Sequence, residues 1–358
     1  MLTPLGWGTL AGSVLLYAAG FALGYPEPVV LATGGLLALA AALAWTAPRP
    51  RLEVRREVTP LKVARGEAAV AVLHVRNLGR GMSGLRAEDR IGGSAHAIDL
   101  PRLPKGAART VSYPLPTQAR GEIAVGPLRL VRADPFGLAR RVREYGQGAV
   151  LLVRPRTVAL PVPPSGRAHH LEGPTSDSAP SGTVTFHTLR EYVVGDDLRH
   201  IHWRSSARTG TLMVRRLIDA SLPTTTVVLD TRDLTELAVD AAASVARAAA
   251  GAGFPVRVFT GEGPLTDAKP DQDAVLDRLA LVGPGTAGVA EAVRLARGGG
   301  SLVLVTADPA AAGRTAGVRR RFDRILCVYL GGTPVSVPGV RIVPISELDA
   351  LPHAWSTR

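Results

Sequence analysis

Residues 187–216 read HTLREYVVGDDLRHIHWRSSARTGTLMVRR, the most distinctive stretch of a 358-residue chain. Arginines, carboxylates, histidines and a tryptophan occur here at a density that no other part of the sequence reaches. A surface loop rarely contains Trp203 among so many arginines, and a buried strand rarely contains Glu191 near Asp196. We therefore interpret residues 186–222 as a charged signature segment, placed where parts of the molecule or a partner meet. Its residues do not disclose a reaction.

The middle of the signature segment contains turn and histidine signals. Residues 195–197 (Gly-Asp-Asp) predict a turn, and either aspartate would cap a short helix that carries Arg199 onward. His200 and His202 would share one face of a strand and could bind a metal together with a third ligand. Because no cysteine or carboxylate stands at a suitable spacing, we predict that the segment holds no metal.

The carboxylates of the segment have arginine partners close at hand. Arginine forms two parallel hydrogen bonds with a carboxylate. We therefore expect Glu191, Asp196 and Asp197 to pair with nearby arginines, namely Arg190, Arg199, Arg204 and Arg208. Trp203 would stack on one of these guanidinium groups. An aromatic residue among arginines also suits nucleic acid, but the interspersed acids disfavour that interpretation, and we expect no nucleic acid as a partner.

The segment resembles the signature of the bacterial membrane-associated proteins grouped as domain of unknown function 58 (DUF58). That signature reads approximately Arg-Glu-Tyr, Gly-Asp, Arg-x-Ile-x-Trp, Ala-Arg and hydrophobic-Val-Arg. The residues that fit it are Arg190, Glu191, Tyr192, Gly195, Asp196, Arg199, Ile201, Trp203, Ala207, Arg208, Leu212, Val214 and Arg215. Upstream, Arg120-Gly121, Gly126-Pro127 and residues 134–138 also fit, so the likeness covers nearly the whole chain.

The resemblance implies partners but no chemistry. Members of DUF58 have no established reaction, and they are often encoded beside MoxR-type AAA+ ATPases and membrane transglutaminase-like proteins. They are suspected of acting with such ATPases in the assembly or maturation of protein complexes. For this chain, the resemblance implies an AAA+ ATPase and other membrane proteins as partners.

After the signature segment, residues 223–350 alternate between strands and helices. Strands are predicted at 224–230, 254–261 and 301–307, and two more at the end of the domain. Helices are predicted at 234–253, 271–282, 288–297 and 310–320. This alternation predicts a doubly wound, largely parallel sheet covered on both faces, and sites in such sheets form beyond the carboxyl ends of strands. Asp230 and Asp308 stand at such ends.

The same α/β domain resembles a von Willebrand factor A domain. That resemblance implies Mg²⁺ held by Asp-x-Ser-x-Ser together with a Thr and an Asp. Here residues 230–234 read Asp-Thr-Arg-Asp-Leu, so both serines are missing. Mg²⁺ requires oxygen ligands, and Arg232 puts a cation where a hydroxyl should be. We therefore predict no metal and no cofactor. Arg232 either pairs with Asp230 or Asp308 and replaces the charge of the ion, or points to solvent.

Before the signature segment, the sequence changes from a β pattern to a linker. Residues 69–77, 109–115 and 121–132 alternate in polarity, with turn residues between them. We predict an immunoglobulin-like β-sandwich over residues 51–155. Its residues 134–138 (Asp-Pro-Phe-Gly-Leu) predict a turn, with Phe136 available to pack against a neighbour. Residues 156–185 are rich in Pro, Ser and Gly and predict a flexible linker.

The N-terminal residues 1–48 contain two apolar stretches, 5–25 and 29–47, each long enough to cross a bilayer. A signal peptide is the alternative, but the start lacks Lys and Arg, and the second stretch follows at once. We predict a transmembrane hairpin. Its glycines allow close contact within the hairpin or in a homo-oligomer, or reflect the ordinary tolerance of membrane helices for glycine; they are Gly6, Gly8, Gly12, Gly20 and Gly24.

Charge predicts how the hairpin is oriented. The arginines that follow it are Arg49, Arg51, Arg55 and Arg56, whereas the turn carries only Glu27. Cationic flanks stay in the cytoplasm, so we expect an inner (cytoplasmic) membrane protein with cytoplasmic soluble domains. The net charge of +12 suits the anionic inner leaflet of the lipid bilayer. Cys327, the lone cysteine, excludes an internal disulfide and is predicted to be a buried small hydrophobe.

Three functions remain open. The first is a membrane-anchored scaffold, because the sequence has no nucleophile–base pair, phosphate-binding glycine loop or paired catalytic carboxylates. The second is an enzyme that uses Glu191, Asp196, His200 and His202, which would then converge on an open pocket. The third is nucleic-acid binding, which ranks last because a membrane tether already accounts for the positive charge.

Overall fold

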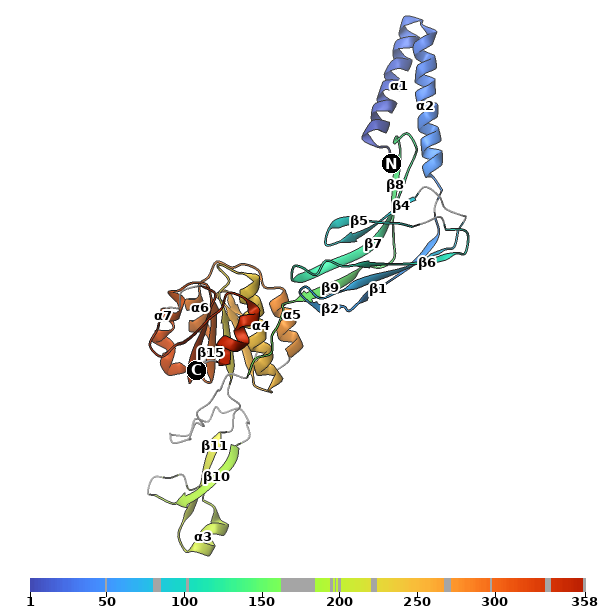
Figure 1. Ribbon diagram of the computed structural model, residues 1–358. Helices are drawn as coiled ribbons and strands as arrows, with labels where there is room; N and C mark the ends of the chain where they lie inside the picture. Colours follow the sequence, from blue (N-terminus) through green and yellow to red (C-terminus); the bar gives the residue numbers. More distant parts are fainter. Residues whose placement is uncertain are drawn as a thin grey trace. The chain divides into compact units, whose positions relative to one another are not determined.

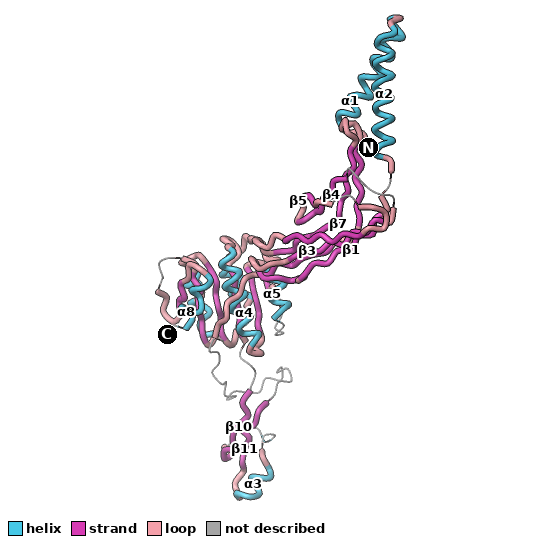
Figure 2. The backbone as a smooth tube through the Cα atoms, turned by 45° about the vertical axis from the view of Figure 1, so that its right-hand side comes forward, coloured by secondary structure: helices cyan, strands magenta, loops and turns pink. Residues whose placement is uncertain are grey.

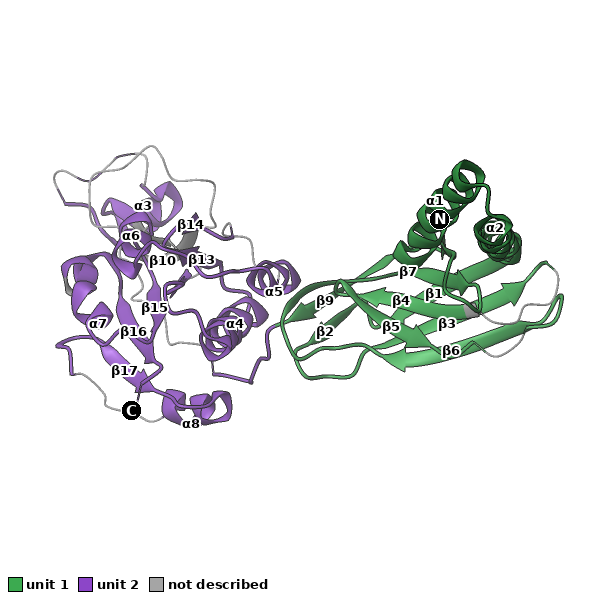
Figure 3. Ribbon diagram, turned by 90° about the horizontal axis from the view of Figure 1, so that it is seen from above, with its two compact units in different colours: residues 1–154 green, residues 155–358 purple. Residues whose placement is uncertain are grey.

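The computed structural model describes residues 1–48, 50–79, 85–100, 103–161, 184–193, 196, 198, 201–219, 224–266, 272–296, 298–331 and 336–356. The chain divides into two compact units, residues 1–154 and 155–358 (Figure 3). Each unit is described by itself below.

Unit 1 starts with two antiparallel helices, α1 (Pro4–Leu23) and α2 (Pro26–Thr46) (Figure 1). The Thr3 hydroxyl caps α1 by accepting a hydrogen bond from the Gly6 amide at 3.1 Å, and α1 ends at Gly24 in the left-handed conformation. Both helices are long and apolar enough to cross a membrane. At 1.5 Å per residue, the 20 residues of α1 span about 30 Å, the thickness of a hydrocarbon core.

The outward surface of the hairpin is apolar, as the sequence predicts. Large exposed side chains cover both helices, among them Leu5, Trp7, Leu15, Phe21, Val30, Leu31, Leu37 and Trp45. The residues between the helices are small, and a Cβ on Gly20 would lie 2.8 Å from the Val29 side chain. Gly8 and Gly12 have open space around them instead. Close contact within the hairpin therefore explains only some of the glycines.

The rest of unit 1 consists of two sheets with a shared core. The three-stranded sheet has the order β1 (Leu52–Thr59), β3 (Val70–Asn77), β6 (Ala108–Pro114). The other has the order β2 (Lys62–Ala64), β9 (Ala149–Arg154), β7 (Gly121–Ala133), β4 (Leu85–Ile91), β5 (Ser94–Ile98), and β8 (Arg140–Tyr145) also pairs with β7. Buried residues of both sheets, such as Ala71 and Val153, form one cluster, which makes this part of the unit a β-sandwich.

A buried ion pair lies inside the sandwich. The side chains of Arg56 and Asp89 are 2% and 0% exposed, and their shortest contact is 2.6 Å. Tyr113 donates a further hydrogen bond to Asp89, and this contact together with burial raises the pKa of Tyr113. Gly126 leaves the space that the guanidinium fills, since a Cβ there would lie 1.9 Å from Arg56 Nη1. Arg56, one of the arginines that follow α2 in the sequence, is therefore enclosed in the folded sandwich.

Unit 2 contains a sheet whose order, over the residues that the structure describes, is β14 (Gly263–Pro264), β13 (Val256–Thr260), β12 (Thr225–Leu229), β15 (Ser301–Thr306), β16 (Arg324–Tyr329), β17 (Arg341–Pro344). All neighbours are parallel except β13 and β14. Every residue of β15 is buried, as expected for a parallel strand covered on both faces.

Helices cover both faces of this sheet, as predicted (Figure 2). On one face lie α4 (Glu236–Gly251), α5 (Gln272–Ala280), the 3₁₀ turn η3 (Leu348–Ala350) and α8 (Leu351–Ser356). On the other lie α6 (Val289–Leu295) and α7 (Ala311–Arg314). The predicted helix 310–320 is instead α7 followed by the 3₁₀ turn η2 (Ala316–Arg321), and two glycines in this stretch weaken a regular helix.

The start of the predicted linker belongs to the α/β domain. The Arg156 amide donates to Asp240 at 2.8 Å, and the Val158 amide donates to Ser244 at 3.1 Å. The indole of Trp355 donates to the Pro161 carbonyl at 2.9 Å. Residues 156–161 are therefore packed, which corrects the start of the linker, and residues 162–183 lie outside the described part.

Cys327 is 1% exposed, and burial raises the pKa of its thiol to about 12. The prediction that Cys327 is buried is confirmed.

We predict that Asp89→Ala destabilises the sandwich by about 3–5 kcal/mol, because it leaves the buried Arg56 guanidinium without its counter-charge. Denaturant unfolding of the full chain in detergent measures this loss. Glu53 supplies the matched control, since it pairs with Arg55 at 3.0 Å on the exposed surface. Glu53→Ala should change the free energy of unfolding by less than about 1 kcal/mol. Equal effects of the two variants would contradict the structural role of the buried pair.

Candidate functional site

The signature segment folds as a β-hairpin with a short helix between its strands (Figure 1). β10 (Val184–Glu191) pairs antiparallel with β11 (Met213–Asp219), and α3 (Trp203–Thr209) lies between them in the sequence. The Tyr192 amide donates to the Leu212 carbonyl at 2.7 Å and continues the ladder. Ile201 and Val214 form an isolated bridge and are both buried. The motif residues therefore sit on a small structured platform, not on a loop.

Arg190 and Asp196 form the bidentate pair that the sequence predicts. Arg190 Nη1 and Nη2 lie 2.8 and 2.7 Å from the two carboxylate oxygens. The Val193 amide donates a third hydrogen bond to Asp196 at 2.9 Å. These hydrogen bonds, first that of Arg190 and then that of Val193, hold the pKa of Asp196 below its usual value. Asp196 thus stays ionised and engaged, and the predicted cap by Asp197 lies outside the described residues.

His202 is the residue that caps α3. Its Nδ1 accepts from the Ser205 amide at 3.2 Å and lies 2.8 Å from the Ser205 hydroxyl. The His202 amide donates to the Met213 carbonyl at 2.8 Å, which ties the start of the helix to β11. Ser206 reinforces this tie, because its hydroxyl accepts from the Met213 amide at 2.8 Å. His202 therefore has a structural task, and it lies at a helix start, not on a strand face.

The outward side of the platform is open. Trp203 is 68% exposed, and Glu191, Arg204 and Arg208 are exposed as well. Within the described part of the chain, no carboxylate pairs with Arg204 or Arg208, no cation pairs with Glu191, and no guanidinium stacks on Trp203. Pairs of these residues with Asp197 or Arg199 would lie outside the described residues. The four residues form an exposed patch, the platform patch.

Four residues of the predicted motif, Gly195, Asp197, Arg199 and His200, lie outside the described residues. Arg215 is placed only by its backbone, opposite Leu189 in the β10–β11 ladder. The predicted pairs of Asp197 and Arg199, and the predicted His200–His202 face, therefore lie outside the described part as well.

A second polar cluster lies at the carboxyl ends of β12 and β15, the two central neighbours at which the strand order reverses. Arg232 Nη2 lies 3.3 Å from Asp230 and 3.3 Å from Asp308. Thr306 donates to Asp230 at 2.8 Å, and Arg314 pairs with Asp308 at 2.9 Å. Of the two arrangements open in the sequence analysis, the structure has Arg232 bridging both carboxylates.

Charges compensate one another within this bridge. Asp230 is only 7% exposed, and its carboxylate raises the pKa of Arg232, with a smaller contribution from Asp308. The pKa of Asp308 is lowered, first by the hydrogen bond from the Ala310 amide and then by Arg314 and Arg232. The guanidinium of Arg232 occupies the carboxylate oxygens that a divalent cation would need. These residues therefore do not fit a Mg²⁺ site.

Among the residues that the structure describes, no three His, Cys, Asp or Glu side chains are grouped to hold a metal ion.

The sequence analysis overlooked the loop beside this cluster. The Thr286 amide donates to Glu262 at 3.0 Å, and the Gly285 amide donates to the Thr231 carbonyl at 2.9 Å. A Cβ on Gly285 would lie 1.9 Å from Glu262 Oε1, so only glycine fits there without a shift. The Gly-Pro-Gly run at 283–285 is the sequence signal that could have indicated this close approach.

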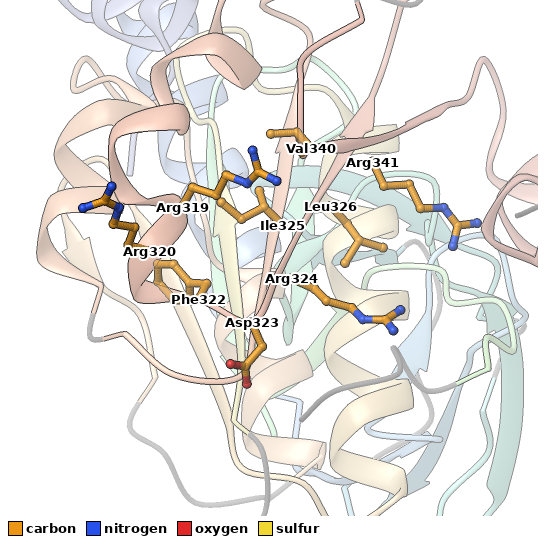
Figure 4. A pocket seen from close by; sticks show the side chains of 10 residues that line it. Arg319, Arg320, Phe322, Asp323, Arg324, Ile325, Leu326, Val340 and Arg341 are labelled. Atoms are coloured by element: carbon orange, nitrogen blue, oxygen red, sulfur yellow. The ribbon is translucent and has the colours of Figure 1, made fainter. Parts of the chain in front are cut away.

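A hollow of about 920 Å³ lies at the opposite, amino ends of β16 and β17 (Figure 4). Its floor is apolar and includes Phe322 and Val340. Its rim is basic, and the arginines that line it are Arg319, Arg320, Arg324 and Arg341. Guanidinium groups around an apolar floor can accept an anionic group. The hollow is separate from the two clusters above.

Comparisons with known proteins give partial matches. No curated protein matches the chain. The CARDB domain of the PF1109 protein from Pyrococcus furiosus, solved with di-metal ions, is 18% identical, covers 29% of this chain and 91% of its own, and has a TM-score of 0.22. The C-terminal domain of wzt is 11% identical over 30% and 78% of the two chains, with a TM-score of 0.23. The similarity to these structures carries no argument about function.

The family described as "Protein of unknown function DUF58" has a model that matches residues 188–274. The matched range begins in β10, includes α3, β11, β12, α4, β13 and β14, and ends in α5. It contains the Arg190–Asp196 pair and, from the second cluster, Asp230 and Arg232, whereas Asp308 lies outside the matched range. The match supports the assignment of this chain to the DUF58 family.

Proposed function

We propose that the chain is a membrane-anchored, cytoplasm-facing scaffold that binds partner proteins. The observation that carries this proposal is the contrast between the two charged clusters and the platform patch. Three carboxylates of these clusters, Asp196, Asp230 and Asp308, are each held by a guanidinium. Trp203 and its neighbouring arginines are instead exposed. Tryptophan and arginine are the residue types that dominate the energetics of protein interfaces.

Membrane anchoring through α1 and α2 is supported by their length and their exposed apolar side chains. The cytoplasmic orientation rests on the arginines after α2, of which Arg51 and Arg55 are exposed. On this proposal the protein resides in the inner (cytoplasmic) membrane, with the β-sandwich and unit 2 in the cytoplasm.

The α/β domain is proposed to be von Willebrand factor A-like and independent of metal. Its parallel sheet with an antiparallel edge strand supports the first part. The Arg232 bridge supports the second, because a fixed guanidinium supplies the positive charge that Asp230 and Asp308 would otherwise take from an ion. Because the Arg232 guanidinium cannot dissociate as a metal ion can, the charge of this part of the domain would not depend on the metal concentration.

The proposed partner is a MoxR-type AAA+ ATPase, with which the chain would act in the assembly or maturation of protein complexes. This part of the proposal comes from the DUF58 resemblance alone. The enzyme alternative draws no support from the described residues of the signature segment, because Asp196 is paired with Arg190 and His202 caps α3.

We predict that the wild-type protein shows no saturable heat on titration with Mg²⁺, because Arg232 neutralises both carboxylates. Arg232→Ser removes the guanidinium and restores a hydroxyl ligand, so this variant should bind Mg²⁺. Isothermal titration calorimetry measures both. The double variant Arg232→Ser/Asp230→Ala is the matched control, and it should again show no saturable heat of Mg²⁺ binding. Micromolar binding by wild type that disappears in Asp230→Ala would contradict the metal-free proposal.

We predict that Trp203→Ala lowers the capture of an AAA+ ATPase from native membranes about tenfold or more, the loss expected for an aromatic interface anchor. Quantitative mass spectrometry after pull-down of the full chain provides the measurement. Leu281→Ala serves as the matched control, since Leu281 is another large exposed side chain of unit 2. Equal capture by wild type, Trp203→Ala and Leu281→Ala would count against the platform patch as the docking surface.

A further inference from the structure

The turn between β7 and β8, residues 134–138, is built to present one apolar side chain. The Asp134 carboxylate faces inward, accepting from the Phe136 amide at 2.9 Å and from the Ala139 amide at 2.5 Å. Gly137 adopts the left-handed conformation that closes the turn. Phe136 is 75% exposed at the tip, whose flanking Pro135 and Gly137 carry no charge. A single exposed apolar side chain is common on protein surfaces, but this one stands on a turn that Asp134 fixes from within.

This turn is fastened to the start of α1. The Thr3 amide donates to the Leu138 carbonyl at 3.0 Å, and the Thr3 hydroxyl donates to the Gly137 carbonyl at 2.6 Å. A Cβ on Gly6 would lie 2.0 Å from the Leu138 carbonyl oxygen, so only glycine permits the approach without a shift. Leu2 and Ala139 form a β-bridge beside these contacts. Figure 1 shows the β7–β8 turn beside this end of the hairpin.

The Leu138 side chain reaches between the helices. It is buried in a cluster with Leu39 and Ala42 of α2, and Leu10 of α1 packs against it. Leu10 lies seven positions after Thr3, which is about 10 Å along the helix axis. The turn therefore lies beside the first two turns of α1 and the last two turns of α2.

The same helix turns carry the aromatic residues expected at a membrane surface. Trp7 and Trp45 are exposed, and they stand near the start of α1 and the end of α2. Tryptophan collects at the boundary between headgroups and acyl chains. Leu138, two residues after Phe136, packs beside these helix turns. Exposed Leu5 continues the apolar surface along α1.

We propose that the turn at residues 134–138 is a membrane-interface element, in which Phe136 inserts into the headgroup–acyl boundary of the leaflet next to the sandwich. This inference rests on the proposed membrane anchoring. A lipid surface fits better than a soluble partner, because the tip is uncharged and adjoins the apolar surface of α1. Arg141 donates to the Ala47 carbonyl at 3.2 Å, which puts a cation at the same end of the hairpin, where anionic headgroups are expected.

The test uses the full chain in lipid nanodiscs with an environment-sensitive NBD label on a single cysteine. Cys327 is buried and has a raised thiol pKa, so it does not compete for the label at neutral pH. Three variants are compared: Phe136→Cys at the turn, Phe21→Cys on the exposed surface of α1, and Leu61→Cys. Leu61 is an exposed apolar residue just beyond the far end of β1, away from the hairpin.

We expect blue-shifted emission at position 136, with strong quenching by nitroxide groups near the headgroups and weaker quenching by deeper ones. Position 21 should be quenched by lipid nitroxides as well, and position 61 should remain unquenched. If position 136 behaves like position 61 while position 21 is quenched, the interface element is refuted and the anchoring stands. If position 21 also escapes quenching, the anchoring itself fails. Blue-shifted emission at 136 without lipid quenching would place the ring against protein and refute the inference too.

Discussion

Pairing between guanidinium groups and carboxylates is the interaction on which this structure depends. It occurs inside the sandwich between Arg56 and Asp89, on the signature hairpin between Arg190 and Asp196, and around Arg232 at the carboxyl ends of β12 and β15. Only the first of these pairs is enclosed. Because a buried charge without a partner is strongly destabilising, the Arg56–Asp89 pair fixes the conformation of the backbone around it.

The three pairs differ in how exposed they are and in which side chains around them face the solvent. Around Arg56 the charges are enclosed, so the pair serves the fold of the sandwich alone. The Arg232 guanidinium is partly exposed. Its positive charge is balanced by the carboxylates of the cluster, which lies where parallel sheets usually bind ligands. On the signature hairpin, pairing of Arg190 and capping by His202 stiffen a small platform from which Trp203 projects. Rigidity beneath an exposed aromatic residue is what a docking surface requires.

The sequence predicted the parts of the fold that follow from local patterns. Apolar runs located α1 and α2, alternation located most strands, and the strand–helix rhythm gave the parallel sheet with helices on both faces. The missing serines after Asp230 led directly to the Arg232 hypothesis, because the expected chemistry at that position is specific. The Arg190–Asp196 pair followed from the short distance between the two residues in the chain.

Features that depend on contacts between residues distant in the sequence could not be predicted from local patterns. Arg56 looks like any flanking arginine until Asp89, thirty-three positions later, comes to lie against it. The spacing of His200 and His202 suggests a shared strand face, whereas the chain places His202 at a helix start. Residues 156–161 have the composition of a linker, and only their contacts with α4 and Trp355 show that they are packed.

The hydrogen bond between Thr3 and Leu138 also has a consequence for biosynthesis. The two residues are 135 positions apart, so the start of α1 leaves the ribosome long before the turn that it contacts has been made. During that interval α1 and α2 have only each other and their surroundings to cover them. Docking of the sandwich on the hairpin is therefore a late event in synthesis, and it can occur only after β7 has been made.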